Sequence, residues 1–361
     1  MRFAEANLYA YKLPYRRRIT WFDSSENESF FVALRLTADD GSHGWSETAI
    51  KPHWSGMPPH AFANLLRDEY LPALEQTDLS DASAVSVAVQ SLPANHLCRM
   101  MIDNACATLL AASVGRPYWN TKGGTREVEM SWCVTRQPPQ EMVHEAVSMI
   151  ENHGFGTLKI KGGQGFDIDL NAIRSIRRAV GPKVTFMVDA NGAYSAEDAG
   201  EYVKMLDGEG VVVAEDPYNM EPDDDFSRLV ADSPIPILVD APSVTIADAE
   251  AFLAAGATAL NVKPGRVGFA EAERIVSAAE ASDAGVCSGM SAESALGTLI
   301  SLQSASALEN PLLPAEQSIF MMLREQVTQY VPEIRNGKMV LPQMADFDDI
   351  IDWDKLSAFS V

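Results

Sequence analysis

The hydrophobic pattern of the chain changes character near residue 127. Before that point, extended runs of alternating apolar and polar residues come first, and segments with helical periodicity follow. Asp39-Asp40-Gly41 stands between two of the extended runs and is typical of a hairpin turn. The pattern predicts strands at 1–13, 29–37 and 43–47, then helices at roughly 60–76, 80–91 and 93–114. Strands followed by helices indicate an α+β region.

Two polar stretches interrupt this first region. One runs from 15 to 28, with Arg16-Arg17-Arg18 at its start, and a Pro-rich stretch covers 51–59. Both read as loops because neither shows a period of two or of 3.6 residues. We expect them to lie at the edge of the α+β region.

From residue 127 onward, short runs rich in Val and Ile alternate with segments of helical periodicity. Repeats of this kind indicate βα units and a parallel sheet. Eight such units indicate closure into a (β/α)8-type barrel. The predicted barrel strands are 128–134, 156–161, 184–189, 211–215, 235–240, 259–263, 285–288 and 312–316.

The last part of the chain contains a turn at Asn336-Gly337 between short extended runs. We expect this tail to pack back on the α+β region. The predicted fold class is therefore α/β, a (β/α)8-type barrel with an N-terminal α+β capping domain completed by the tail. The predicted bounds are 1–124 for the capping domain, 125–320 for the barrel and 321–361 for the C-terminal segment.

Composition narrows the class of protein. A length of 361 residues fits a barrel plus an accessory domain. The net charge of −22 argues against a nucleic-acid partner, which requires clustered Lys and Arg. No stretch approaches the roughly 18 apolar residues that span a bilayer, and the N-terminus lacks an apolar signal segment. We expect a cytoplasmic protein with no membrane and no nucleic-acid partner.

The four cysteines carry no metal or disulfide pattern. They lack a C-x-x-C pair and any regular spacing. Reduced and mostly buried thiols are expected for Cys98, Cys106, Cys133 and Cys287.

Charged residues follow five successive predicted barrel strands. They are Lys161, Asp189, Glu215, Asp240 and Lys263, separated by 23 to 28 residues. In a (β/α)8 barrel, the carboxyl ends of the strands meet at one face, and that face carries the active site. The pattern therefore predicts that three acids and two lysines lie close together.

The three acids indicate a metal site. Each one alone could simply cap the following helix, as Asp189-Ala190-Asn191-Gly192 would allow. Three carboxylates at three consecutive strand ends, however, repel one another unless a cation lies between them. Hard oxygen ligands favour Mg²⁺, with Mn²⁺ as a substitute.

The lysines indicate proton transfer. Lys159 and Lys161 lie two apart on one strand and so point to the same face. Burial and a neighbouring cation both lower the pKa of a lysine, toward that of a general base. Lys263 ends a strand across the barrel, although by itself it could be a surface lysine. A divalent cation with flanking lysines suits abstraction of a proton α to a carboxylate through an enolate.

Together these residues resemble the enolase superfamily, in particular its muconate-lactonizing-enzyme subgroup (the mandelate racemase/muconate lactonizing enzyme family). The resemblance covers nearly the whole chain, and its motifs are specific for the superfamily rather than for one reaction. They are Leu158-Lys159-Ile160-Lys161, Val188-Asp189-Ala190-Asn191, Ala214-Glu215-Asp216-Pro217, Val239-Asp240 and Val262-Lys263-Pro264.

The resemblance implies roles for individual residues. Asp189, Glu215 and Asp240 would ligate Mg²⁺, and Lys161 and Lys263 would form the acid/base pair. Lys159 would assist electrostatically, and Glu316 would orient the substrate or share in proton transfer. Loops 16–28 and 51–59 would close over the substrate. Within them the pocket candidates, for which ordinary loop packing is the alternative, are Trp21, Phe22, His53 and Trp54.

Some departures from related motifs concern the metal site, and others concern the reaction. Asp240-Ala241-Pro242-Ser243 stands where the subgroup commonly has Asp-Glu-Ser. Pro314-Ala315-Glu316-Gln317 replaces the Asp-x-Asp of dipeptide epimerases, which argues against a dipeptide substrate. No His-Asp dyad is evident on strands six and seven, which argues against the mandelate-racemase and acid-sugar-dehydratase branches.

The expected enzyme is a metal-dependent isomerase or lyase that acts on a small carboxylate. The favoured outcome is racemisation or epimerisation of a small amino-acid-like substrate. The same residues also suit dehydration of a hydroxy amino acid such as a 3-hydroxyproline, or cycloisomerisation of a muconate-type acid. An inactive metal-binding barrel is the alternative from a different class. Related barrels commonly self-associate, so a homo-oligomer is expected.

Overall fold

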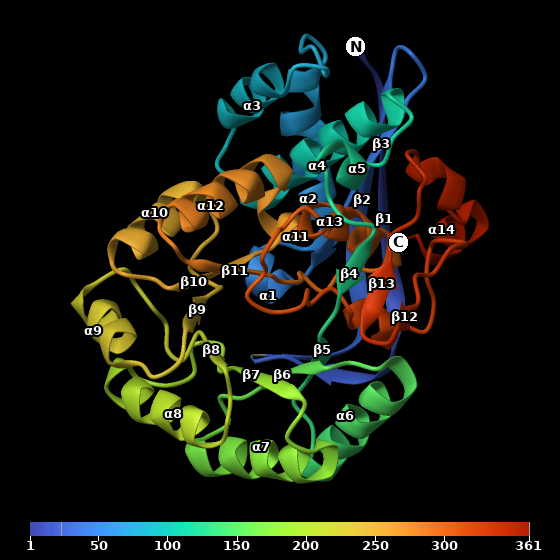
Figure 1. Cartoon of the computed structure of the whole chain (residues 1–361). Helices are drawn as coiled ribbons and strands as arrows, with labels where there is room; N and C mark the ends of the chain where they lie inside the picture. The colour runs from blue at the N-terminus through green and yellow to red at the C-terminus, as the bar shows by residue number, and fades with distance from the viewer. Residues whose placement is uncertain (23, 361) are drawn as a thin grey trace.

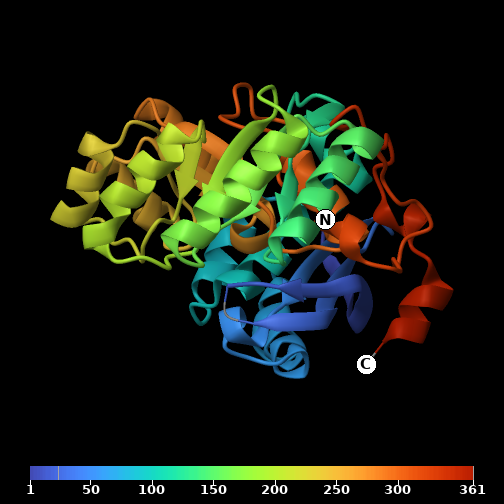
Figure 2. The ribbon, with the colours of Figure 1, turned by 90° about the horizontal axis from the view of Figure 1, so that it is seen from below.

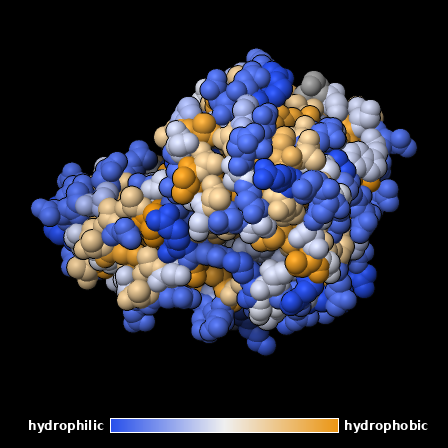
Figure 3. All heavy atoms as spheres, turned by 90° about the horizontal axis from the view of Figure 1, so that it is seen from above, coloured by the Kyte–Doolittle hydropathy of each residue, from blue (hydrophilic) through white to orange (hydrophobic). Residues whose placement is uncertain are grey.

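The computed structural model describes residues 1–22 and 24–360. A ring of parallel strands with helices outside it forms one part of the molecule, and the N-terminal strands form a separate layer beside it (Figures 1 and 2). On the face shown in Figure 3, hydrophilic side chains predominate and apolar groups are interspersed in small patches. None of the described helices is long and apolar enough to cross a membrane.

The N-terminal layer is an antiparallel sheet in the order β1-β2-β3. Its strands are β1 (Phe3–Thr20), β2 (Ser25–Ala38) and β3 (His43–Ile50). The predicted turn is present, with the Gly41 amide donating to the Ala38 carbonyl at 3.0 Å. Helix α4 (His96–Ser113) packs so closely on β3 that a Cβ at Gly44 would lie 2.0 Å from the Ala105 carbonyl oxygen.

Two predicted loops are more regular than the sequence indicated. Most of 16–28 is strand, because β1 continues to Thr20 and pairs with Ser25 after a register shift that follows Pro14. Tyr15 and Ile19 are buried in this stretch, so polar neighbours masked its alternating pattern. Asp23 falls in the same predicted loop and lies outside the described residues, as does Val361. The second loop contains the short helix α1 (Pro52–Ser55).

The predicted helix at 60–76 is divided into three segments. These are α2 (Pro59–Leu65), the π-helical η1 (Leu66–Tyr70) and the 3-10 helix η2 (Leu71–Leu74). Pro72 has no amide hydrogen to continue the α-helical pattern, which accounts for the change of helix type. The other two predicted helices are present as α3 (Ala82–Gln90) and α4.

The barrel sheet has seven parallel strands, ordered from β5 to β11 along the chain. Helices of mixed apolar and polar character cover its outside (Figure 1). The strands are β5 (Trp132–Val134), β6 (Thr157–Lys161), β7 (Thr185–Asp189), β8 (Val213–Glu215), β9 (Ile237–Val239), β10 (Ala259–Val262) and β11 (Gly285–Ser288). The helices are α6 (Pro139–His153), α7 (Phe166–Val180), α8 (Ala196–Gly208), α9 (Asp224–Asp232), α10 (Ile246–Ala254), α11 (Pro264–Val267), α12 (Phe269–Ala281) and α13 (Ala295–Ala305).

The eighth predicted strand, 312–316, is not a strand, which corrects the sequence prediction. The segment nevertheless lies where an eighth strand would close the barrel. The Glu316 amide donates to the Ser288 carbonyl at 2.9 Å, and the Ser131 amide donates to the Ala315 carbonyl at 2.8 Å. Pro314 lacks an amide donor, so a regular ladder cannot form. The barrel is therefore of the (β/α)8 type, with seven strands and one irregular closing segment.

The first predicted barrel strand, 128–134, is also divided. Only β5 belongs to the barrel, whereas β4 (Glu127–Glu129) pairs with the C-terminal hairpin. That hairpin consists of β12 (Ile334–Arg335) and β13 (Lys338–Val340). Asn336 and Gly337 take positive φ values of 52° and 69° between them, as the predicted turn requires.

The tail contacts the N-terminal sheet. The Trp353 ring on α14 (Trp353–Phe359) lies 6.1 Å from the Tyr9 ring, and the Arg35 guanidinium pairs with Asp348 at 2.6 Å. Short helices α5 (Tyr118–Thr121), η3 (Ile319–Met322) and η4 (Phe347–Ile350) complete the described elements. The four cysteines are buried and free, as predicted. The domain bounds 1–124, 125–320 and 321–361 remain a prediction.

Candidate active site

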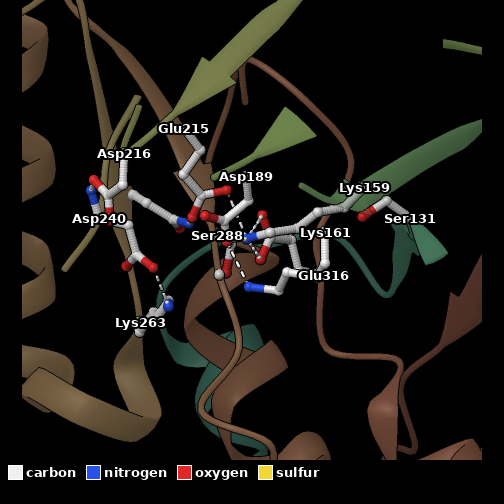
Figure 4. A network of polar contacts seen from close by, with 12 residues as sticks. Ser131, Lys159, Lys161, Asp189, Glu215, Asp216, Asp240, Lys263, Ser288 and Glu316 are labelled. Carbon is white, nitrogen blue, oxygen red and sulfur yellow. Dashed lines mark hydrogen bonds and ion pairs between the residues drawn. The ribbon is translucent and has the colours of Figure 1, made fainter. Parts of the chain in front are cut away.

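The carboxyl ends of the barrel strands bring the predicted residues to one face (Figure 4). Lys161, Asp189 and Glu215 are direct neighbours in register on β6, β7 and β8. Asp240 and Lys263 come immediately after β9 and β10. The charged residues therefore form a single row, because neighbouring strands are paired in register and end at the same level of the barrel.

A cavity of about 690 Å³ lies over this row. Lys159, Lys161 and Lys263 line it from the barrel side. Three of the four residues predicted from the capping loops also line it, namely Trp21, Phe22 and Trp54. His53 does not line it and is exposed on α1. Whether these side chains contact a substrate remains a prediction.

Lys159 is the most deeply buried of the three lysines, at 2 % exposed. Its Nζ lies 2.6 Å from Glu215 Oε2, 2.9 Å from Glu316 Oε2 and 3.3 Å from Asp189 Oδ2. Burial lowers the pKa of Lys159, but the surrounding carboxylates more than offset this and raise it well above its usual value. The expected lowering of the pKa is therefore wrong for Lys159 in this charge environment.

Lys161 and Lys263 contact opposite ends of the carboxylate row. Lys161 Nζ lies 2.5 Å from Asp189 Oδ2, and Lys263 Nζ lies 2.5 Å from Asp240 Oδ2. Burial lowers the pKa of Lys161, but Asp189 and other nearby groups, Glu215 among them, together outweigh that effect and raise it. The expected lowering is therefore wrong for Lys161 as well. Both side chains keep partial exposure to the cavity, at 14 % and 12 %.

The three carboxylates have the chemistry of a site for a hard divalent cation. Glu215 Oε2 and Asp240 Oδ1 are buried, and each lies within ion-pair distance of a cation, Lys159 at 2.6 Å and Arg266 at 3.2 Å. Burial and Asp189 raise the pKa of Glu215 well above its usual value, as expected for like charges in close proximity. Burial would also raise the pKa of Asp240, but Lys263 and Arg266 hold it below the usual value. Oxygen donors of this kind suit Mg²⁺.

The oxygens of this triad are not all gathered around one point. Among the described residues, the trio whose ligand atoms all lie within 4.8 Å is His43, Asp346 and Asp348. Asp348 there already accepts hydrogen bonds from Arg35 and from the Trp45 indole at 2.7 Å. That trio is an ion-pair network between the N-terminal sheet and the tail. At the ends of the barrel strands, by contrast, lysine ammonium groups already contact the carboxylates that a metal would bind.

Three supporting residues had not been assigned roles from the sequence. Both carboxylate oxygens of Asp216 accept backbone amides, from Asp240 at 3.0 Å and Ala241 at 2.8 Å. Burial raises the pKa of Asp216 to about 7. Asn261 donates to Glu215 Oε1 at 3.0 Å, and Arg266 donates to the Asp240 carbonyl at 2.9 Å. The position of Asp216 directly after Glu215 was the signal that could have identified it.

Comparisons with known proteins agree with this architecture. The sequence profile of the family described as enolase C-terminal domain-like matches residues 141–345. An o-succinylbenzoate synthase from Geobacillus kaustophilus is 27% identical over 338 residues, covering 92% of this chain and 88% of that protein. An N-succinylamino acid racemase from Thermus thermophilus is 26% identical over 352 residues, covering 95% and 93%.

The fold also matches a solved structure. A muconate lactonizing enzyme from Pseudomonas fluorescens, complexed with muconolactone, has a TM-score of 0.93 at 22% identity over 100% of this chain and 99% of that one. The chain therefore belongs to the enolase C-terminal domain-like family, in the muconate-lactonizing-enzyme subgroup of the enolase superfamily. It is an enzyme of the metal-dependent isomerase or lyase class, and enzymes of this superfamily generally use Mg²⁺.

Proposed function

We propose that the protein racemises or epimerises an amino-acid-like carboxylate by exchanging its α-proton between Lys161 and Lys263. The observation that carries this proposal is the position of the two lysines. They contact Asp189 and Asp240, at opposite ends of the carboxylate row, and both line the same cavity. A carbon held between them is accessible to an ammonium or amine from either face, which inversion requires.

Each charged residue of the site has a separate role in the proposed reaction. Asp189, Glu215 and Asp240 would hold Mg²⁺ or Mn²⁺, which when bound supplies Lewis-acid stabilisation of an enolate. Lys159 stays protonated because Glu215 and Glu316 raise its pKa, and so it keeps a fixed positive charge beneath the reacting carboxylate. Glu316 pairs with Lys159 and orients it. Asp216 holds the backbone at Asp240 in place through two amide hydrogen bonds.

The first substrates to test are N-acylated amino acids. A relative 26% identical to this chain is named an N-succinylamino acid racemase, and its name motivates the choice. In D2O with Mg²⁺, each enantiomer should exchange its α-proton, as followed by NMR. Each should also lose optical activity at a comparable rate. Complete absence of exchange in the metal-loaded protein, with every N-acylamino acid tried, would contradict the proposal.

A lyase reaction is the second candidate, because a relative 27% identical to this chain is named an o-succinylbenzoate synthase. Elimination requires proton removal from one face only. Loss of the product-forming reaction in a Lys161→Ala variant but not in Lys263→Ala, or the reverse, together with no racemisation, would favour elimination. Cycloisomerisation would give the same asymmetry and is distinguished by its lactone product.

A further inference from the structure

We infer that the substrate carries no carboxylate beyond its α-carboxylate, and that the remainder which fills the outer cavity is not anionic. This inference rests on the proposed function and deepens it. It concerns the charges that surround the cavity. Every cation that lines the cavity among the described residues already contacts a carboxylate of the protein.

Lys51 is the cation of the capping region at this cavity. Its side chain is 3 % exposed and pairs with Glu26, and its Nζ also donates to Ser29 Oγ at 2.8 Å and Tyr15 Oη at 3.1 Å. Three partners satisfy the three hydrogens of an ammonium group. Lys51 therefore has no donor left for a second substrate carboxylate.

The remaining cations lie beside the three carboxylates that would bind the metal. Arg266 contacts Asp240 at 3.2 Å, and the three barrel lysines contact Asp189, Glu215 and Asp240. His96 also lines the cavity, and burial lowers its pKa, so its imidazole is neutral at pH 7. None of these groups provides an unpaired positive charge in the outer part of the cavity.

The charge balance of the cavity opposes a second carboxylate. Among the described residues, seven carboxyl groups either line the cavity or pair with a cation that lines it: Glu26, Asp189, Glu215, Asp216, Glu221, Asp240 and Glu316. Five cations in the same described part of the chain line the cavity: Lys51, Lys159, Lys161, Lys263 and Arg266. A divalent metal ion offsets the difference if every acid is ionised, and with Asp216 neutral one positive charge remains for the α-carboxylate. A second carboxylate would be desolvated without a counter-charge, which is unfavourable.

The capping loops contribute large apolar side chains to the outer wall, whereas Glu221 adds a carboxylate that pairs with no cation among the described residues. Trp21 and Trp54 meet with ring centroids 5.5 Å apart, and Phe22 and Trp54 are each about half exposed. Arg136, whose guanidinium lies 5.2 Å from the Phe22 ring centroid, does not line the cavity and donates to the Gly162 and Phe22 carbonyls. An uncharged chain would bury apolar area against these rings, whereas a carboxylate there would be desolvated without a counter-charge.

Three acyl derivatives of one amino acid test this inference. N-butyryl-, N-succinyl- and N-(4-aminobutyryl)-L-phenylalanine have acyl chains of similar length that end in a neutral, an anionic and a cationic group. We expect kcat/KM for α-proton exchange to be at least about tenfold higher for the butyryl compound than for the succinyl one, and the cationic compound should not fall below the succinyl one. The corresponding Kd values, measured by calorimetry on the Mg²⁺-loaded enzyme, should follow the same order.

Equal or better turnover and binding of the succinyl derivative would overturn the inference. If none of the three compounds exchanges its proton, the proposed function fails, and the order of the Kd values still decides the inference.

A variant tests the part played by Lys51. Glu26→Gln removes the counter-charge of Lys51, so we expect the succinyl-to-butyryl ratio of kcat/KM to rise about tenfold. Glu28→Gln is the matched control, because Glu28 lies on the same strand but pairs with Lys12 and does not line the cavity. An unchanged ratio in folded Glu26→Gln would contradict the assignment of Lys51 as a neutralised cation.

Discussion

Lys159 Nζ lies 2.9 Å from Glu316 Oε2, and both side chains are 2 % exposed. Lys159 belongs to β6, whereas Glu316 ends the irregular segment that closes the barrel. Since Glu215 and Asp189 also lie within 3.3 Å of the same ammonium, one buried lysine contacts three carboxylates. Buried ion pairs, as well as the backbone hydrogen bonds of the sheet, therefore stabilise the barrel beneath the active site.

Replacing that lysine should be costly in the absence of metal. Lys159→Met leaves buried carboxylates without their cation, and we expect a loss of about 3–5 kcal/mol in the free energy of unfolding in EDTA. Mg²⁺ should restore more stability to the variant than it adds to the wild type, because it replaces the missing charge. Urea unfolding with and without Mg²⁺ measures both effects. Lys204→Met, on the exposed face of α8, is the control; a Lys159→Met protein as stable as the wild type in EDTA would contradict the prediction.

The two partly exposed lysines should act on opposite faces of the substrate. Lys161→Ala and Lys263→Ala should each lose at least about 100-fold of the exchange rate, one for the L and the other for the D enantiomer. Proton exchange in D2O, measured separately for each enantiomer, gives the rates. The same enantiomer being affected in both variants would rule out the assignment of one lysine to each face.

Asp216 should control metal affinity without contacting the substrate. An amide at this position offers one acceptor to two backbone amides, so Asp216→Asn should loosen the backbone at Asp240. We expect Mg²⁺ or Mn²⁺ to bind about 10- to 100-fold more weakly, as measured by calorimetry. Asp207→Asn, exposed on α8, provides the matched control. Unchanged metal affinity in folded Asp216→Asn would show that the two hydrogen bonds do not position the ligand.

Glu293 should make stability depend on pH. It is fully buried beside Ser291 and near Glu47, and burial raises its pKa from 4.5 to about 7. The fold therefore favours the neutral acid, so this contribution is complete below pH 4.5 and is lost as the pH rises through 7. The difference corresponds to about 3 kcal/mol.

Glu293→Gln removes this titration. The free energy of unfolding of the variant minus that of the wild type should rise by about 3 kcal/mol as the pH increases from 4.5 to 8. Denaturant unfolding at each pH measures this difference. Glu280→Gln, exposed on α12, should run parallel to the wild type. A constant difference between Glu293→Gln and the wild type across this range would show that the carboxyl does not titrate there.

Much of the fold could be predicted because its signals are local. The runs that end at Asp189 and Glu215 read as strands from their apolar residues alone, and the Asn336-Gly337 turn follows from backbone preferences. The segment 312–316 was misread because its apolar residues resemble a strand, whereas Pro314 prevents the ladder. Residues 16–20 were misread because the arginines concealed an alternating pattern.

The sequence by itself determined the order of the elements, the row of charges at the strand ends and the family, since each depends on residue types at short, regular spacings. Only the tertiary structure decided which charges are neutralised. Lys159 has a raised pKa, Lys51 is paired with Glu26, and Asp216 accepts a hydrogen bond from the Asp240 backbone amide. These properties arise from burial and from contacts between residues distant along the chain, and neither is encoded in any local pattern.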